Sequence, residues 1–463
     1  MVWLNLSVTV NSRNSLTRLT HFFTYKLTNP LSNFTRKKYL AYQVTFFRVS
    51  IIHIQNKKYR YCIIRVDRAM QIFKQILNTT CRKSLLNGQN INNIRKMSLD
   101  STKLEITKTT TPKEKLPNDQ LIFGKTFTDH MLEIEWTQEN GWGVPKISPY
   151  HNFSFDPSTV VFHYAFELFE GMKAYRDSKN QIRTFRSDKN MIRMNQSAER
   201  IALPTFDGEE LMKLIDKFLI TDESFVPQGA GYSLYLRPTL IGTTASLGVG
   251  TPDKALLYVI ASPVGPYYGT GFKPVSLEAT DYAVRAWPGG VGNRKLGANY
   301  APCILPQLEA AQRGYQQNLW LFGDEGYVTE VGTMNVFFAF KDSEGKKELV
   351  TAPLDGTILE GVTRDSILEL CKERLPSEWT VVERKFTIHE VEERAAKGEL
   401  IEAFGAGTAA VVSPIERIGW KGKDISVPIA AGDAGELTTQ VAEWIRKIQY
   451  GEEEYKNWSR VAQ

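Results

Sequence analysis

A lysine within a glycine-rich stretch is a candidate for covalent chemistry. Lys295 lies in WPGGVGNRKLGANYAP (287–302), and Tyr300 follows it by five residues. Glycines let the backbone turn sharply and approach a ligand closely. A lysine held in such a place, with its ammonium partly desolvated, can form a Schiff base with an aldehyde. A surface loop with a solvated lysine is the competing interpretation of this segment taken alone.

Two further glycine-containing segments could bind a phosphate group. In EGVTRDSILELCKERL (360–375), a Gly-Val-Thr sequence leads into an amphipathic helical pattern. Thr363 is therefore expected at or near the N-cap, where free amides and the helix dipole suit an anion. An ordinary capped helix is the alternative.

The other segment, EAFGAGTAAVVSP (402–414), formally matches the G-x-G-x-x-A dinucleotide motif. Pro414 ends the run too early for the long helix that a dinucleotide site needs. The loop amides and the Thr408 hydroxyl can still bind a phosphate. Because no G-x-x-x-x-G-K-[ST] motif occurs, nucleotide hydrolysis is excluded.

One carboxylate stands between two short polar stretches on an expected pair of strands. Glu330, in GYVTEVGTMN (326–335), would by default pair with a surface lysine. It could instead hold a protonated pyridine nitrogen and keep the ring an electron sink. A lysine, a phosphate-binding helix end and an acid together indicate a pyridoxal-phosphate site better than a site for any other cofactor.

Hydrophobic patterns predict the elements that must position these residues. The segment GEELMKLIDKFLIT (208–221) has a strong helical period, and Tyr232–Arg237 alternates as a half-buried strand. Tyr235 and Arg237 therefore point to one face of that strand, where an arginine fork suits a carboxylate. The other expected elements are strands over 255–262, 318–323 and 333–340 and helices over 364–375 and from about 436. No internal repeat appears, and an α/β or α+β protein of two domains is expected.

Composition excludes several classes of protein. The chain has 463 residues, of which 42% are hydrophobic and 23% charged, which is ordinary for a chain with a large core. Disordered, collagen-like and disulfide-stapled proteins are therefore excluded, and no apolar stretch is long enough to predict a membrane span. The four cysteines are scattered and have no metal-site spacing, so no metal is expected.

Charge divides the chain into a basic leader and an acidic body. Residues 1–96 hold 17 Lys/Arg and one acid, Asp67, whereas residues 97–463 hold 40 basic and 50 acidic residues. From Met70 to Lys96 the leader is hydroxylated, acid-free and locally amphipathic, as a mitochondrial presequence is. A nucleic-acid-binding arm is the alternative. Residues 1–69 are longer than a presequence needs, and a start at Met97 would give a cytoplasmic form.

Six blocks of this chain closely resemble the branched-chain amino-acid aminotransferases, and the fungal members most. They are FELFEGMKAY (166–175), SLYLRPTLIG (233–242), RAWPGGVGNRKLGANYAP (285–302), TEVGTMN (329–335), LEGVTRDS (359–366) and FGAGTAA (404–410). The resemblance covers about Leu121 to Tyr450. It implies fold type IV, with a small N-terminal α/β domain, a larger C-terminal domain and pyridoxal 5'-phosphate at their interface. The expected divisions are a leader (1–96), a polar linker (97–120), the small domain (121–266), a connection (267–275) and the large domain (276–463).

The resemblance also implies roles for individual residues. Lys295 resembles the lysine that forms the internal aldimine and then moves the Cα proton. Glu330 resembles the acid at the pyridine nitrogen, Tyr300 the phenol at the 3′-oxygen, and Arg193 the phosphate-binding arginine. The remaining cofactor positions would be Thr333, Val362, Thr363 and Thr408. The substrate pocket would be lined by Tyr164, Phe169, Tyr235, Arg237, Thr333 and Ala409.

What the resemblance implies about activity is the reversible, ping-pong transamination of leucine, isoleucine and valine with 2-oxoglutarate. The expected partners are small amino acids and 2-oxo acids together with a second copy of the chain, but no nucleic acid and no membrane. The leader favours the mitochondrial matrix. A D-amino-acid aminotransferase or an aminodeoxychorismate lyase would share the lysine and the cofactor but is usually shorter. A nucleic-acid-binding factor and an inactive scaffold are the remaining alternatives.

Overall fold

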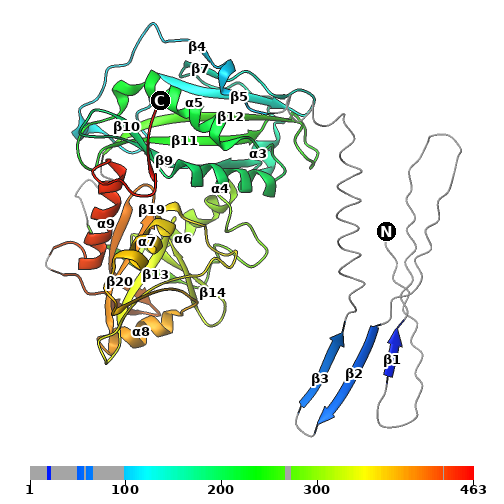
Figure 1. Cartoon of the computed structure of the whole chain (residues 1–463), viewed down its shortest axis with the longest axis vertical. Coiled ribbons are helices and arrows are strands. Elements are labelled where there is room, and N and C mark those ends of the chain that lie inside the picture. Colours follow the sequence, from blue (N-terminus) through cyan, green and yellow to red (C-terminus); the bar gives the residue numbers. More distant parts are fainter. Residues whose placement is uncertain (1–17, 22–48, 57–58, 66–97, 266–272, 431) are drawn as a thin grey trace, which may run out of the picture. The chain divides into compact units, whose positions relative to one another are not determined.

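The computed structural model describes residues 18–21, 49–56, 59–65, 98–265, 273–430 and 432–463 (Figure 1). The chain divides into two compact units, Met1–Ile94 and Arg95–Gln463, and each is described by itself. In the first unit, β1 (Arg18–His21), β2 (Val49–Asn56) and β3 (Tyr59–Arg65) form an antiparallel sheet in that order. The presequence expected at 70–96 lies outside the described residues.

A ten-stranded sheet forms the first half of the second unit. Its strands run in the order β22-β10-β9-β11-β12-β5-β7-β4, with β6 on β5 and β8 on β11. Their bounds are β4 Glu105–Ile106, β5 His130–Thr137, β6 Gly141–Trp142, β7 Lys146–Pro149, β8 Glu167–Phe169, β9 Met172–Arg176, β10 Ile182–Phe185, β11 Ser233–Gly242, β12 Lys254–Val264 and β22 Ser459–Val461. The segment expected as a linker, 97–120, thus supplies an edge strand, because β4 pairs with β7.

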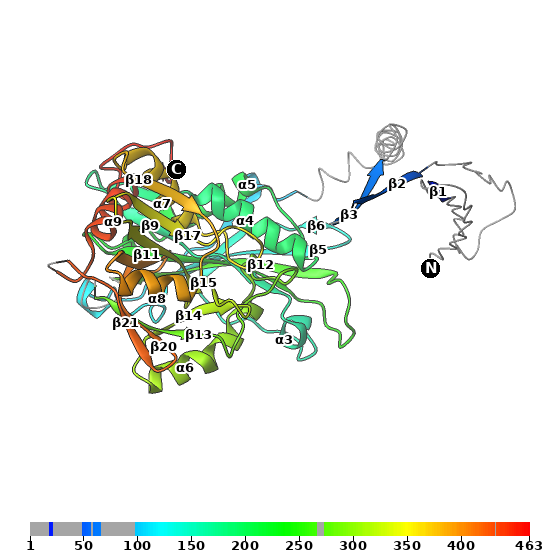
Figure 2. The ribbon, with the colours of Figure 1, turned by 90° about the horizontal axis from the view of Figure 1, so that it is seen from below.

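Helices α4 (Ser187–Arg200) and α5 (Gly208–Thr221) lie side by side against this sheet (Figure 2). Helix α5 has the predicted bounds, since Asp207 caps it through the Glu209 amide and its apolar face is buried in the core with strand residues such as Leu236 and Leu257. The apolar run before β8 contains a short helix, α3 (Val160–Tyr164), which ends at Ala165 with φ 53°.

A second sheet of nine strands lies beyond Val264. Its order is β15-β14-β13-β20-β19-β16-β17-β18, with β21 on β20, and β15 also pairs with β16. Six strands therefore form a closed ring. The bounds are β13 Val275–Thr280, β14 Gln317–Phe322, β15 Tyr327–Val331, β16 Met334–Lys341, β17 Lys347–Thr351, β18 Trp379–Glu383, β19 Leu400–Gly407, β20 Val411–Trp420 and β21 Lys423–Ser426.

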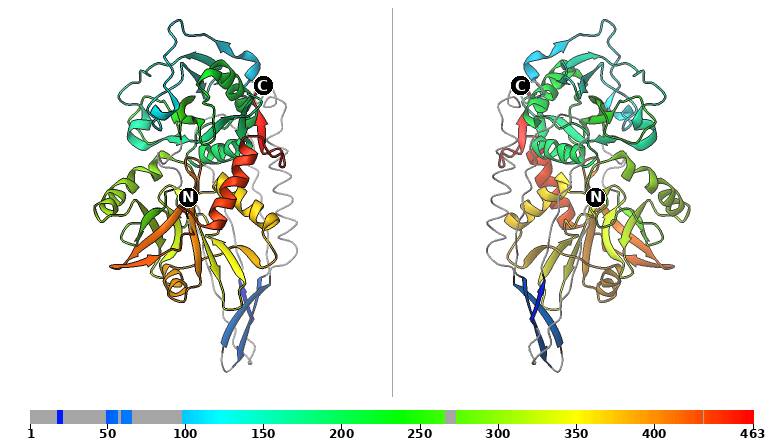
Figure 3. Two further views of the ribbon diagram at one scale, coloured as in Figure 1. Left: turned by 90° about the vertical axis from the view of Figure 1, so that its left-hand side faces the viewer. Right: turned by 90° about the vertical axis from the view of Figure 1, so that its right-hand side faces the viewer.

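Two cores stabilise this half of the molecule. One core consists of strand residues inside the ring together with buried residues of α8 (Ile388–Ala396). In the other core, α7 (Val362–Arg374) and α9 (Glu436–Gln449) pack against β16 and β19. Helices α7 and α9 are neighbours (Figure 3). Helix α6 (Ile304–Gln312) lies against β14.

The two sheets confirm the expected two-domain α/β fold. The chain passes from the first sheet to the second between Val264 and Val275, so most of the connection expected at 267–275 lies outside the described residues. It returns at its end, where β22 pairs with β10. Within the described part of the chain, no helix is long and apolar enough to cross a bilayer.

Candidate active site

The loop that carries Lys295 is fastened to the first sheet and its helices. The Lys295 amide donates to Ser197 Oγ on α4 at 3.0 Å, and the Lys295 carbonyl accepts from the Phe169 amide on β8 at 3.1 Å. Asn299 holds the turn by donating to two backbone carbonyls of the same loop. With its backbone fixed, Lys295 places Nζ 3.1 Å from the hydroxyl of Tyr300, and both side chains are partly buried.

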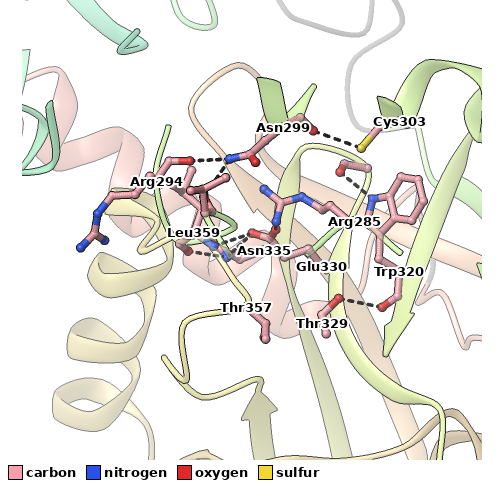
Figure 4. Close-up of polar contacts among 12 residues, drawn as sticks. Arg285, Arg294, Asn299, Cys303, Trp320, Thr329, Glu330, Asn335, Thr357 and Leu359 are labelled. Atoms are coloured by element: carbon pink, nitrogen blue, oxygen red, sulfur yellow. Dashed lines mark hydrogen bonds and ion pairs between the residues drawn. The ribbon is translucent and has the colours of Figure 1, made fainter. Parts of the chain in front are cut away.

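Glu330 is a buried carboxylate in which one oxygen accepts two hydrogen bonds and the other takes part only in an ion pair. Oε1 accepts from Asn335 Nδ2 at 3.0 Å and from the Leu359 amide at 3.1 Å (Figure 4). Oε2 lies 2.5 Å from Arg285 Nη1, in an ion pair whose geometry makes no hydrogen bond. Burial raises the pKa of Glu330, while the charges of Arg285 and Lys295 and the Leu359 amide oppose that rise.

Arg193 is buried on α4 and uses its whole guanidinium. Nε and Nη2 donate to the two oxygens of Glu170, each at 2.8 Å, and Nη1 donates to the Glu360 carbonyl at 2.9 Å. Burial works against its charged form, but the Glu170 carboxylate holds the pKa of Arg193 above its ordinary value. The arginine thus joins α4 to the segment that enters α7.

The predicted phosphate-binding segments meet at one hollow. Helix α7 begins at Val362, so Thr363 is its second residue, and its N-cap Gly361 offers no side-chain hydrogen bond to the free amides. The Thr363 hydroxyl donates to the Gly407 carbonyl at 3.1 Å, which joins the helix start to the end of β19. Val362, Thr363 and Thr408 line the hollow together. Strand β20 follows this loop instead of a helix, which agrees with the rejection of a dinucleotide site.

An aromatic and cationic group lies beside Lys295. The Phe169 ring centroid is 5.0 Å from Lys295 Nζ and 4.6 Å from the Arg237 guanidinium carbon. The rings of Phe169 and Tyr300 are 5.0 Å apart, and Arg237 Nη2 donates to the Tyr235 hydroxyl at 3.0 Å. Tyr235 and Arg237 reach one face of β11, as predicted, but the strand is buried on both faces and not half-buried.

Three predicted pocket residues lie elsewhere or face another group. The Tyr164 hydroxyl donates to the Leu247 carbonyl, and its ring packs near His163. Thr333 is exposed in the two-residue turn between β15 and β16. Ala409 is held through its carbonyl, which accepts from Lys173 Nζ at 2.6 Å.

The sequence reasoning did not single out four residues that take part in these contacts, namely Glu170, Lys173, Arg285 and Asn335. Each stands within or beside a glycine-containing block that was recognised, such as FELFEGMKAY and RAWPGGVGNRKLGANYAP. No local signal distinguishes them from surface charges.

Comparisons with known proteins agree with this geometry. The family model Amino-transferase class IV matches residues 167–418. The cytosolic branched-chain-amino-acid aminotransferase of Saccharomyces cerevisiae is 69% identical over 366 residues, covering 78% of this chain and 97% of that protein. The mitochondrial enzyme of the same yeast is 67% identical, with coverages of 78% and 93%, and that of Schizosaccharomyces pombe is 49% identical, with 85% and 92%.

Solved structures resemble the same part of the chain. The T.th. branched-chain amino acid aminotransferase with pyridoxamine 5'-phosphate has a TM-score of 0.56 at 27% identity, covering 71% of this chain and 98% of that one. The Escherichia coli branched-chain amino acid aminotransferase has a TM-score of 0.58 at 23% identity, covering 72% and 100%, a likeness of fold alone.

Proposed function

This chain belongs to the branched-chain-amino-acid aminotransferases of the class IV family, and from that premise we propose that the residues around Lys295 are its active site. The enzyme depends on pyridoxal phosphate and transfers the amino group of leucine, isoleucine or valine to 2-oxoglutarate, reversibly, giving branched 2-oxo acids and glutamate. The observation that carries the assignment is the Lys295–Tyr300 pair, which lies close enough to buried Glu330 for Lys295 to influence its pKa.

The residues present fit the cofactor. Oε2 of Glu330 is buried without a hydrogen bond and can accept one from a protonated ring nitrogen. The uncapped start of α7 offers amides to a phosphate, and the hydroxyls of Thr363 and Thr408 line the same hollow. Arg193 donates to the Glu360 carbonyl just before α7, and from there it would contribute positive charge to the phosphate-binding end of the site. When bound, pyridoxal phosphate supplies an electron sink and a carrier for the amino group.

The roles of the chain's own side chains follow from their positions. Lys295 would bond covalently to the cofactor and, once released, remove the proton from the substrate Cα as a base. The Tyr300 hydroxyl orients the Lys295 amine. Glu330, in its ion pair with Arg285, would hold a proton at the ring nitrogen. Phe169 covers both Lys295 and Arg237 and would exclude water from the reacting atoms.

Arg237 and Tyr235 suit a pocket for two kinds of substrate. Because Arg237 is held by the Tyr235 hydroxyl, its remaining donors can bind the side-chain carboxylate of glutamate or 2-oxoglutarate. The aromatic faces of Phe169 and Tyr235 would accept a branched aliphatic side chain instead. Thr333, Ala409 and Tyr164 are proposed substrate contacts on the resemblance alone.

The decisive experiment is the visible absorption of the full chain supplied with pyridoxal phosphate. We expect a band that is bleached by L-leucine and restored by 2-oxoglutarate. Lys295→Ala should lack the lysine-bound band, whereas Lys346→Ala, a change at a side chain 72% exposed, should keep it. A band that ignores leucine but responds to D-alanine would retain the fold and overturn the substrate assignment.

The exposed apolar face of α6 supports a homodimer. Ile304, Leu305 and Leu308 are 53%, 65% and 56% exposed, and Trp287, in the loop before this helix, is 55% exposed. Contiguous apolar surface of this kind marks protein interfaces. Light scattering should give twice the chain mass, and Leu305→Lys should shift it toward the mass of one chain. A monomeric parent would refute this proposal.

The basic leader supports import into mitochondria. Relatives are named as cytosolic and as mitochondrial enzymes, so both compartments occur among similar proteins. We propose that residues 70–96, which have five basic residues and no acid, direct this chain to the matrix. A fluorescent protein fused after residue 96 should enter mitochondria. A diffuse cytoplasmic signal would favour a start at Met97.

A further inference from the structure

A second, larger cavity adjoins the phosphate hollow beside Ala409. Its volume is about 550 Å³, within the range of small-molecule sites. Strand residues Lys173, Tyr175 and Ser233 form one side, and Val411, Val412 and Ala442 contribute an apolar side. Ala409 is the one proposed active-site residue in its described lining, but Lys173, Tyr175 and Val411 line both this cavity and the phosphate hollow, so the two spaces are neighbours.

Lys173 brings an unbalanced positive charge to this cavity. Its side chain is buried, and Nζ donates to the Ala409 carbonyl at 2.6 Å. Within the described parts of the chain no carboxylate pairs with it, and burial alone lowers the pKa of Lys173 to about 8. The undescribed segment 266–272, which follows a neighbouring strand, contains no acidic residue that could supply the missing charge.

Ser233 adds an unused hydroxyl on the same face. Its side chain is 1% exposed, and Oγ has no hydrogen-bond partner in the described structure. Strand β9 pairs with β11 so that Lys173 lies opposite Tyr235, which makes Ser233 its diagonal neighbour. Diagonal neighbours on one face are close enough for a long side chain and a short one to hold the same group. A buried hydroxyl without a partner is costly unless a ligand or water satisfies it.

We propose that this cavity binds an amphipathic monocarboxylate, with the carboxylate at Lys173 and Ser233 and the aliphatic or aromatic body against Val411, Val412 and Ala442. The anion neutralises the buried ammonium and accepts from the serine hydroxyl, and the apolar wall buries the rest of the ligand. This site does not depend on the transamination proposed above.

Binding at this cavity is coupled to the active site through the Ala409 turn. A bound carboxylate competes with the Ala409 carbonyl for Lys173 Nζ, and Thr408, the preceding residue, lines the proposed phosphate hollow. The ligand therefore weakens the hydrogen bond between Lys173 and the Ala409 carbonyl that fixes the turn. Since such coupling is reciprocal, a ligand in the active site must change the affinity of the second cavity by the same factor.

The test is calorimetric titration of the full chain, loaded with pyridoxal phosphate, with decanoate as the probe. We expect saturable binding of one decanoate per chain. Lys173→Met should weaken it about tenfold or more and Ser233→Ala about threefold or more, whereas Lys179→Met, at an exposed lysine beyond the same strand, should not. Circular dichroism of each variant distinguishes lost binding from lost folding.

A competition experiment separates the cavity from the active site. 4-Methylvalerate, which forms a complex with the T.th. relative, serves as the active-site ligand. Saturating 4-methylvalerate should change decanoate affinity to a limiting value, because both bind together. Progressive displacement would place decanoate in the active site and overturn the proposal. Absence of saturable binding, or equal binding by folded Lys173→Met, would overturn it as well.

Discussion

Replacement of Lys173 by methionine should change how the stability of this protein depends on pH. The ammonium is buried against the Ala409 carbonyl without an anionic partner in the described structure, and burial lowers the pKa of Lys173 from 10.5 to about 8. In the unfolded chain the lysine regains its ordinary pKa. Between about pH 8 and 10.5 the unfolded state therefore binds more protons, and the parent protein becomes more stable as pH rises through this window.

The magnitude follows from the shift. A tenfold change in proton affinity corresponds to 1.36 kcal/mol, so the charged lysine costs the folded state about 3 kcal/mol at neutral pH. Between about pH 7 and pH 9.5 the linkage relation returns about 2 kcal/mol of that cost. Methionine carries no titrating group. The unfolding free energy of Lys173→Met minus that of the parent should therefore fall by about 2 kcal/mol over this range.

Urea unfolding followed by tryptophan fluorescence measures this difference at a series of pH values. Subtracting the parent removes the contributions of every other titrating group, and Lys179→Met controls for the loss of a positive charge at the surface. A difference that stays flat from pH 7 to 9.5 would refute the reasoning, because it would mean that Lys173 titrates alike in both states. A difference that rises with pH would mean that folding raises the pKa of Lys173 instead of lowering it.

Three further predictions concern the proposed site. Glu330→Gln should lower kcat about 100-fold, because a neutral amide no longer holds a proton at the ring nitrogen of the bound cofactor. Glu170→Ala should lower the unfolding free energy by about 3 to 5 kcal/mol, since it leaves the buried Arg193 guanidinium without its anion. Gly171→Ala should raise KM for 2-oxoglutarate, because a methyl group there would collide with the Tyr235 hydroxyl that holds Arg237.

Each of these has an outcome that would contradict it. Stopped-flow bleaching by leucine at the parental rate in Glu330→Gln would remove that carboxylate from the chemistry. An unchanged urea midpoint in Glu170→Ala would mean that Arg193 finds another anion. Gly250→Ala, at a glycine with open space around its Cβ position and no left-handed φ, is the control for the glycine variant, and equal KM values would refute the collision argument.

Features set by local pattern could be predicted from the sequence. The bounds of helix α5 follow from its helical period and the Asp207 cap alone. The shared face of Tyr235 and Arg237 follows from the two-residue repeat of a strand. The short separation of Lys295 and Tyr300 likewise lies within one loop. These relations join residues a few positions apart, where backbone geometry alone decides which side chains meet.

Contacts between distant residues could not be predicted in this way. The Lys173–Ala409 hydrogen bond spans 236 positions, and the Arg193–Glu360 bond spans 167. Both depend on how the two sheets pack, which no periodicity records. The strands β1 to β3 were not expected either, because the leader was judged by charge and composition. The edge strand β4 was missed because a two-residue strand in a polar segment has no alternation to detect.

The return of the chain end to the first sheet limits how the two halves can move. The backbone crosses from the first sheet to the second between Val264 and Val275, and crosses back between α9 and β22, where Arg460 also pairs with Asp216. Two bodies joined at a single point can swivel in any direction, but bodies joined at two points can turn only about the line through both. The second crossing therefore removes the free swivel that a single covalent connection would allow, and it acts together with the hydrogen bonds that Arg193 and Lys173 make between the halves. Cutting the chain after Gln449 would remove this second covalent connection and leave the halves joined by the first crossing and by those side-chain contacts.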